Sequence, residues 1–323
     1  MRLEEIPFIT HVPRDGRGVL LQPWYDHDKG EWDMYFEARP GDFIRIEMIE
    51  YHSGIFYSHR QVVKSDFEMP LVGLVVQHLS FKGIPRLLFS LIDDFNMLCA
   101  CLKKIAIFSS LEDDCSSSLI RSELEYLFSL VRAMYDILQK LVGKITRLLV
   151  PQDGGSCISQ MPDSFAKIVL DGDTIRSPEE LMRKYSLPLP LAHFYHSRAT
   201  IFRQVRSTRV AIEHHGKNIP DVFVTENGPG IRTSGLPLWE EMAVWSMHDI
   251  QPNGIGSVQS LAAFLTDSCL DTCASLESAL REVIDRNLLP PPIVADAKTF
   301  YRNPLAAELI GLEEMVRSPW RCR

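Results

Sequence analysis

The sequence predicts a mainly α protein: an up-and-down helical bundle with a small irregular or β N-terminal extension and a short β-hairpin. Apolar residues recur at helical spacing through most of residues 71–284, and a heptad pattern runs through residues 119–150. Strand-like alternation is confined to short segments. The chain accordingly divides into an extension, a bundle and a tail: residues 1–68, 69–288 and 289–323.

Composition narrows the class of protein. The chain has 323 residues, 46% of them hydrophobic, which is enough for a substantial core. Its net charge of −8 makes it a poor general nucleic-acid binder, so any RNA contact needs a local basic patch. The seven cysteines are scattered and show no zinc-ligand spacing, and we expect no metal and no cofactor. The chain has neither the apolar run of a signal peptide nor that of a membrane span, which predicts a reduced cytoplasmic protein.

The N-terminal extension, residues 1–68, differs from the rest of the chain. It contains several prolines and many aromatic residues, and residues 43–48 alternate between apolar and polar side chains. Asp28-Lys29-Gly30 and Pro40-Gly41-Asp42 are typical of turns. We expect short strands or an irregular arm packed on the main body.

Two long helices are expected next, over residues 71–108 and 119–150. The second has apolar residues in alternating steps of three and four: Leu124, Leu127, Val131, Met134, Leu138, Leu141, Ile145 and Leu148. The short polar linker between the helices predicts an antiparallel pair. The heptad seam is longer than one partner within the chain needs, which favours a homodimer.

The remaining elements follow in order. Ser177-Pro178-Glu179-Glu180 is typical of a helix start, and a longer helix is expected from residue 191 to His215, with Gly216 as its stop. Residues 221–228 are typical of a strand that enters an Asn-Gly turn, with a return strand over residues 231–233. A last long helix is expected over residues 258–284, and the tail is expected to hold one short helix near residues 304–316.

The end of the predicted 191–215 helix concentrates chemically active side chains. Arg209 is followed after four residues by His214 and after five by His215. A guanidinium holds a phosphate charge at any pH, and an imidazole moves protons near neutrality. Arg209 falls on the apolar stripe of the helix, where an unpaired charge is costly, so it needs a partner or a ligand.

This arrangement resembles the HEPN superfamily, whose hallmark is an arginine followed at this spacing by a histidine near the end of a helix. The resemblance covers residues 71–284 and implies an all-α bundle, dimerisation and, in many members, metal-independent ribonuclease activity. It implies that Arg209 binds the scissile phosphate and that His214 or His215 acts as general acid or base, with Glu213 in support. Active members usually carry a polar residue directly after the arginine, and this chain has Val210 there.

Each candidate residue also has a structural interpretation. Arg209 could pair with Glu213 one turn later or with an acidic residue on a neighbouring helix, and the histidines could cap the helix end. Three further arginines could form an RNA-contacting surface or a solvated helix face: Arg198, Arg203 and Arg206. We expect ordinary packing or a surface position for His193 and His196.

Two functions remain open from the sequence. The first is a metal-independent endoribonuclease that cleaves RNA by attack of the ribose 2′-hydroxyl, acting as a homodimer. The second is a non-catalytic, dimeric binding or assembly module in which Arg209 and Glu213 form a structural pair. The RNA substrate and any cognate antitoxin are not encoded in these patterns.

Overall fold

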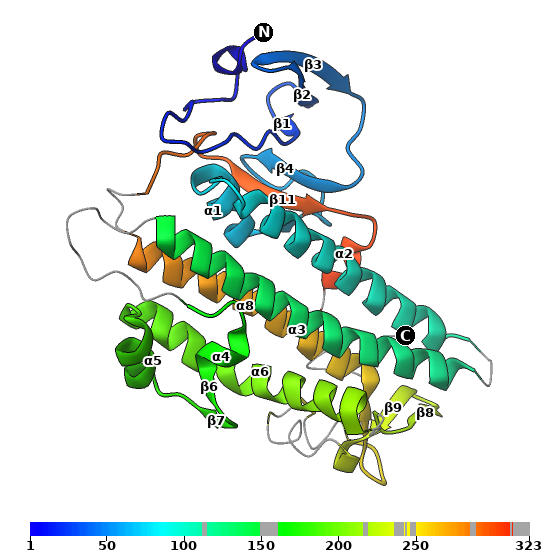
Figure 1. Cartoon of the computed structure of the whole chain (residues 1–323). Helices are drawn as coiled ribbons and strands as arrows, with labels where there is room; N and C mark the ends of the chain where they lie inside the picture. The colour runs from blue at the N-terminus through cyan, green and yellow to red at the C-terminus, as the bar shows by residue number, and fades with distance from the viewer. Residues whose placement is uncertain are drawn as a thin grey trace.

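The protein is a mixed α/β structure in which a sheet covers one end of a layer of long helices (Figure 1). The computed structural model describes residues 1–323 except 112–114, 149–160, 216–218, 236–241, 243, 246–249, 285–288, 311 and 313–323. Along the part of the chain it describes, no helix is long and apolar enough to cross a membrane.

The prediction of a mainly α helical bundle is wrong, because residues 1–68 and the tail together build a six-stranded sheet. Its strands follow the spatial order β3-β2-β1-β4-β11-β5. Their bounds are β1 Trp24–Asp26, β2 Glu31–Arg39, β3 Asp42–Met48, β4 Gly54–Ser58, β5 Phe67–Glu68 and β11 Lys298–Arg302. β1 and β4 run parallel, and the other neighbouring pairs are antiparallel. The sheet is too extensive for an accessory arm.

Two turns of this sheet form at the residues predicted from the sequence, around Gly30 and Gly41. Gly30 and Gly41 both have positive φ, at +70° and +79°, which favours glycine. The carboxylate of Asp26 accepts hydrogen bonds from the backbone N–H groups of Asp28 and Lys29, at 3.0 and 3.2 Å. These contacts fix the β1–β2 turn. The strand β11 was not anticipated, because its partners β4 and β5 lie more than two hundred residues earlier in the chain.

The helical layer is built from four long helices, which follow the short α1, Pro70–His78, in the chain. Their bounds are α2 Ile84–Ser109, α3 Ser116–Leu148, α6 Leu189–His215 and α8 Val258–Val283. α2 and α3 run antiparallel, because the end of α2 lies beside the start of α3 and the start of α2 beside the end of α3. Nζ of Lys104 lies 2.8 Å from the carboxylate of Glu123, and Nζ of Lys144 lies 2.6 Å from the point where a Cβ atom on Gly83 would be. The expected pair is therefore present.

The heptad seam of α3 is buried within the chain. Every seam residue from Leu124 to Ile145 is at most 2% exposed, and only Leu148 is exposed. α3 packs against α2, α6 and α8, so that its seam serves the core of a single chain. The length of the seam therefore supplies no surface for a second copy.

Two small units flank α6. α4 (Phe165–Val169), β6 (Leu170–Asp171), β7 (Thr174–Ile175) and α5 (Pro178–Tyr185) precede it. The predicted hairpin follows it as β8 (Val222–Thr225) and β9 (Gly228–Arg232), and β10 (Ile255–Ser257) adds a third strand. The 3-10 turns are η1 (Leu3–Glu5), η2 (Thr233–Gly235) and η3 (Ala306–Leu309), the last within the predicted tail helix.

Candidate functional site

The last turns of α6 carry the predicted Arg209 motif. Arg209 is half-buried, one turn beyond the buried Val205, and Ile212 on the next turn packs against the core. The backbone of Glu213, His214 and His215 completes α6, but their side chains lie outside the described residues, as does Gly216. The motif therefore lies on one helical segment, and the distance from Arg209 to either imidazole is undefined.

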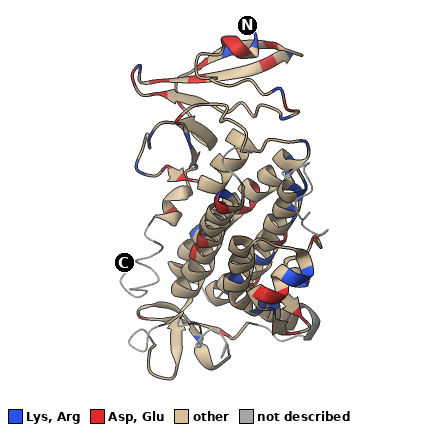
Figure 2. Ribbon diagram, turned by 90° about the vertical axis from the view of Figure 1, so that its left-hand side faces the viewer, with Lys and Arg blue, Asp and Glu red and all other residues tan. Residues whose placement is uncertain are grey.

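Two of the three arginines expected on an RNA-contacting surface form ion pairs. Arg198 pairs with Asp271 of α8, and its Nη2 donates a hydrogen bond to Oγ of Ser275 at 2.6 Å. Arg206 lies 3.8 Å from Asp173. Arg203 is half-buried on the same helix. Basic and acidic segments are interspersed along the helices (Figure 2), so that the positive potential of α6 is partly neutralised locally.

His193 and His196 lie on the exposed side of the start of α6. Nδ1 of His196 is 2.9 Å from the backbone oxygen of Arg176, which is a structural contact. Over the described residues, no group of three or more His, Cys, Asp or Glu side chains is arranged to hold a metal ion.

The sheet holds a serine–histidine contact whose geometry opposes nucleophilic catalysis. Oγ of Ser58 is 3.0 Å from Nε2 of His27, and Nε of Arg60 donates a long hydrogen bond of 3.4 Å to Nδ1 of the same ring. Because a guanidinium only donates, Nδ1 must accept, and the proton of the neutral ring is on Nε2. His27 is then a donor toward Ser58 and has no free base nitrogen for its hydroxyl. Ser58 is also fully buried.

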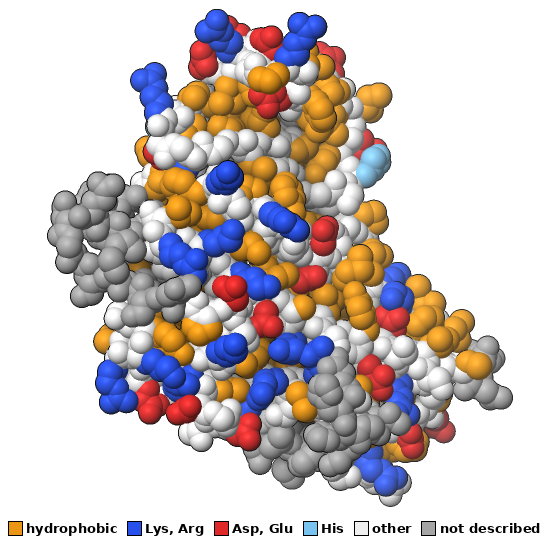
Figure 3. Space-filling view, viewed as in Figure 1, with side chains coloured by type: hydrophobic (Ala, Val, Ile, Leu, Met, Phe, Trp, Pro, Cys, Tyr) orange, Lys and Arg blue, Asp and Glu red, His pale blue; other side chains and the backbone are white. Residues whose placement is uncertain are grey.

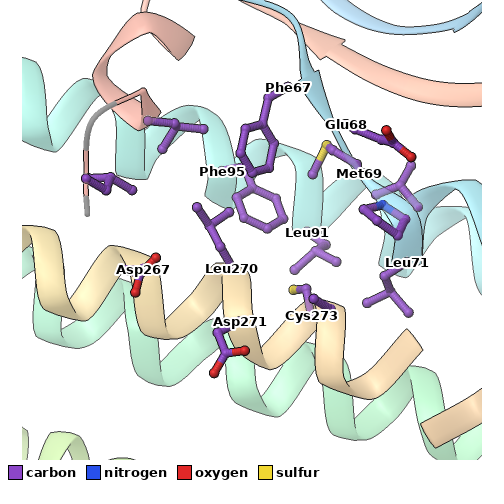
Figure 4. A pocket seen from close by; sticks show the side chains of 15 residues that line it. Phe67, Glu68, Met69, Leu71, Leu91, Phe95, Asp267, Leu270, Asp271 and Cys273 are labelled. Carbon is purple, nitrogen blue, oxygen red and sulfur yellow. The ribbon is translucent and has the colours of Figure 1, made fainter. Parts of the chain in front are cut away.

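A cavity of about 620 Å³ opens between β5, the start of α1, α2, α8 and η3. We call it the α8 pocket (Figure 4). Its walls are mostly apolar: Phe67, Met69, Pro70, Leu71, Val72, Leu91, Phe95, Leu270, Cys273, Ala274, Leu309 and Leu312. This volume lies within the range of small-molecule pockets, which are typically about 300–1,000 Å³ and mainly apolar.

The ionisable lining of the α8 pocket is acidic, apart from one thiol. Glu68, Asp267 and Asp271 are its carboxylates, and among the described lining residues there is no Lys, Arg or His. Nζ of Lys298 lies 2.8 Å from the carboxylate of Glu68, and Arg198 of α6 pairs with Asp271. Neither of these two cations lines the pocket. Burial raises the pKa of the Cys273 thiol to about 12, which keeps it protonated and unreactive at neutral pH.

The sequence did not indicate this pocket. Its lining comes from five elements separated by up to about 240 residues, and most of the side chains are ordinary core types. No short motif marks them. Glu68 lies in β5, and Asp267 and Asp271 lie one turn apart on α8. From the sequence alone, each of these carboxylates is expected to be an ordinary surface charge.

Comparisons of the chain with models of protein families, with curated proteins and with solved structures found no match. The class of the protein is therefore defined by its own structure: a mixed α/β fold with an apolar, acid-rimmed pocket beside α8.

Proposed function

We propose that this protein is a non-catalytic binding module whose α8 pocket takes a small apolar molecule bearing a positive charge. The supporting observation is the composition of the pocket, in which apolar walls are combined with three carboxylates and no basic side chain in its described lining. Burial of apolar surface supplies most of the binding free energy, at about 25 cal/mol per Å². Glu68 and Asp271 are each paired with a cation that stands outside the lining, and the described lining itself adds no positive side chain, so a cation is favoured over an anion of the same shape.

An aromatic ring strengthens the choice of a cation. Phe67 and Phe95 lie beside each other at the pocket (Figure 4); Phe95 is 2% exposed, so the half-buried Phe67 is the ring that can attract an ammonium group that has left water. A quaternary or primary amine at the end of an alkyl or aryl body satisfies both parts of the lining. Among the described lining residues there is no activated nucleophile, since the Cys273 thiol is protonated at neutral pH, and this supports binding rather than turnover.

Displacement of a fluorescent apolar probe tests the proposal. N-phenyl-1-naphthylamine is bound to the full-length protein and competed with octyltrimethylammonium or with nonanoate, which carry the same octyl chain and opposite charges. The ammonium compound is expected to displace the probe at least tenfold more effectively, a difference of about 1.4 kcal/mol. Equal displacement by both compounds contradicts the assignment of a cationic ligand.

A pair of matched variants locates the binding. Ala274 lines the pocket from an exposed position on α8, and Ala274→Trp should fill the space without disturbing the core. Ala106→Trp places the same side chain at an exposed position of α2 outside the pocket. Probe binding should be lost in the first variant and retained in the second. Loss in both, or in neither, excludes the α8 pocket.

A second candidate function, RNA cleavage, rests on the spacing of Arg209 and the two histidines along the final turns of α6. In this candidate Arg209 binds the scissile phosphate. His214 or His215 assists attack of the 2′-hydroxyl, which expels the 5′-oxygen and leaves a cyclic phosphate, as the resemblance to the HEPN superfamily implies.

RNA incubated with the protein in EDTA provides the test of this candidate. Wild type should cut RNA and leave DNA intact, Arg209→Ala should abolish cutting, and Arg86→Ala, at an exposed arginine of α2, should retain it. RNA that is equally stable with wild type and with Arg209→Ala eliminates the ribonuclease.

A further inference from the structure

β3 is an edge strand of the six-stranded sheet, with β2 on one side. An edge strand presents N–H and C=O groups that a further strand can bind. In β3 the start of this edge is already occupied: the backbone N–H of Phe43 donates to the oxygen of Met1 at 2.8 Å, and the amino group of Met1 donates to the oxygen of Phe43 at 3.0 Å.

These two bonds set the direction of every backbone group in β3. In an antiparallel ladder, successive residues direct their N–H and C=O groups to opposite sides of the strand. Because Phe43 bonds outward to Met1, Arg45 and Glu47 also point outward, while Ile44, Ile46 and Met48 point toward β2. Within the described chain, the backbone groups of Arg45 and Glu47 form no hydrogen bonds on that outer side.

The side chains of the outward-pointing residues have opposite charges. Arg45 is 38% exposed and Glu47 is 82% exposed at the side chain, and they lie two residues apart on one face, 3.3 Å from each other. Within its own chain Arg45 also pairs with Asp33 of β2. A second β3 strand, antiparallel and with its two-fold axis at Ile46, places each Arg45 opposite the partner's Glu47. Each of these pairs can exchange both backbone hydrogen bonds, and the Ile46 residues form the non-hydrogen-bonded pair on the axis.

Neighbouring registers are excluded by the same two observations. A two-fold axis at Arg45 or at Glu47 sets identical charges directly opposite each other, which is unfavourable. An axis at Ile44 requires the outward groups of Phe43, which Met1 already occupies. Charge and hydrogen-bond phase therefore select the register centred on Ile46. In this register pairing ends at Ile44, opposite the partner's Met48, and does not use the outward groups of Phe43.

The outer face of the same hairpin is apolar and exposed. Phe36, Ile44 and Ile46 are 55%, 53% and 41% exposed. Phe36 pairs with Ile44 and Met34 with Ile46 across β2 and β3, so that they form one continuous surface. Hydrophobic side chains gather over the N-terminal sheet in the space-filling view (Figure 3). Joining two such hairpins extends this apolar row across the two-fold axis and removes part of it from water.

We infer that two copies of this chain associate through β3, antiparallel and centred on Ile46, to form one continuous sheet. The partner is a second copy because β3 is complementary to itself in this register, in both charge and hydrogen-bond phase. The interface uses the sheet and not the seam of α3. It depends neither on the α8 pocket nor on the Arg209 motif, so it stands or falls separately from the proposed functions.

Light scattering after gel filtration gives the first test. Wild type is expected at twice the chain mass, and Ile46→Lys, which sets two ammonium groups against each other on the axis, is expected at the mass of one chain. Ile107→Lys is the matched control, because Ile107 is an exposed isoleucine of α2, 47% exposed, away from the sheet. A monomeric wild type at its highest soluble concentration, or a dimer that survives Ile46→Lys, overturns the interface.

Disulfide trapping tests the register. In a background with Cys115, Cys157 and Cys322 changed to serine, Ile46→Cys should give a covalent dimer under oxidised glutathione, because opposed non-hydrogen-bonded residues lie within disulfide reach. Ile44→Cys alone should stay monomeric on denaturing gels, since it faces Met48 of the partner subunit. A mixture of Ile44→Cys with Met48→Cys should cross-link. Self-cross-linking of Ile44→Cys that equals that of Ile46→Cys contradicts the proposed register.

Discussion

Asp94 of α2 shows how burial alters a single side chain. It is half-buried, its Oδ2 has no hydrogen-bond partner among the described residues, and it lies close enough to Cys269 of α8 to raise the pKa of that thiol. Desolvation, with a smaller contribution from Asp93, raises the pKa of Asp94 from 3.8 to about 6. The folded protein therefore holds this proton more tightly than the unfolded chain does.

The stability of the protein should reflect this shift. The contribution of protonated Asp94 is complete below the unfolded pKa of 3.8 and is lost as the pH rises through about 6. Asp94→Asn removes the titration. The variant should match wild type near pH 4 and exceed it by about 1–2 kcal/mol at pH 7, measured by urea unfolding across this range.

The exposed neighbour provides the control. Asp93→Asn should change the pH dependence much less, because Asp93 is in contact with solvent. If the difference between Asp94→Asn and wild type is the same at every pH, the desolvation of Asp94 is not the cause.

The candidate binding residues also show what residue types alone predict. Arg198 and Arg206 are correctly recognised as cations of α6 from the sequence, but Asp271 and Asp173, which pair with them, come from other elements. The sequence contains no signal for these pairings, because each depends on which helix or loop packs beside α6.

At the scale of the element, α5 is determined locally. Ser177 Oγ accepts a hydrogen bond from the N–H of Glu180 at 3.3 Å, and the Glu180 carboxylate accepts one from the N–H of Ser177 at 2.8 Å. This is the reciprocal capping box that the Ser-Pro-Glu-Glu sequence predicts, with Pro178 at the first helical position.

Removal of this cap should have a measurable cost. Ser177→Ala leaves the N–H of Glu180 without its side-chain acceptor and should lower the free energy of unfolding by about 1 kcal/mol. Ser278→Ala, at an exposed position of α8, provides the comparison and should be close to neutral. Equal stability of the two variants in urea would show that the cap contributes nothing.

The long helices are predicted from periodicity, and their partners are not. Residues 119–150 indicate a helix with one continuous apolar face, and α3 confirms this over Ser116–Leu148. The same pattern suits a seam between two chains and a core within one chain. The packing of α2, α6 and α8 on α3 decides for the second, because it buries the seam from Leu124 to Ile145.

In the whole molecule, β11 connects the C-terminal part of the chain to the N-terminal sheet by pairing with β4 and β5. Arg302 of β11 contacts Asp66 through two bonds, Nε to Oδ1 at 2.6 Å and Nη2 to Oδ2 at 2.7 Å. The side chain of Asp66 is fully buried and that of Arg302 is 12% exposed. The guanidinium also lies over the ring of Trp32, 4.9 Å from its centroid. The pair thus anchors β11 in the N-terminal sheet.

Loss of one partner of this pair should destabilise the entire fold. Arg302→Ala leaves a buried carboxylate without its cation and should cost about 3–5 kcal/mol in urea unfolding. Arg302→Ala combined with Asp66→Asn should cost less than the sum of the two single changes, because no charge then remains buried. Strict additivity in this double-mutant cycle would contradict a direct interaction.

The local elements of this protein follow from its sequence: the long helices, the capped start of α5, the β8–β9 hairpin and the turns at Gly30 and Gly41. These depend on periodicity, caps and turn residues, which act over a few neighbouring residues. Three features arise from tertiary packing: the single sheet formed by residues 1–68 and β11, the internal position of the α3 seam, and the acid-rimmed pocket beside α8. Each of these depends on contacts between residues far apart in the chain, whose energies no local pattern encodes.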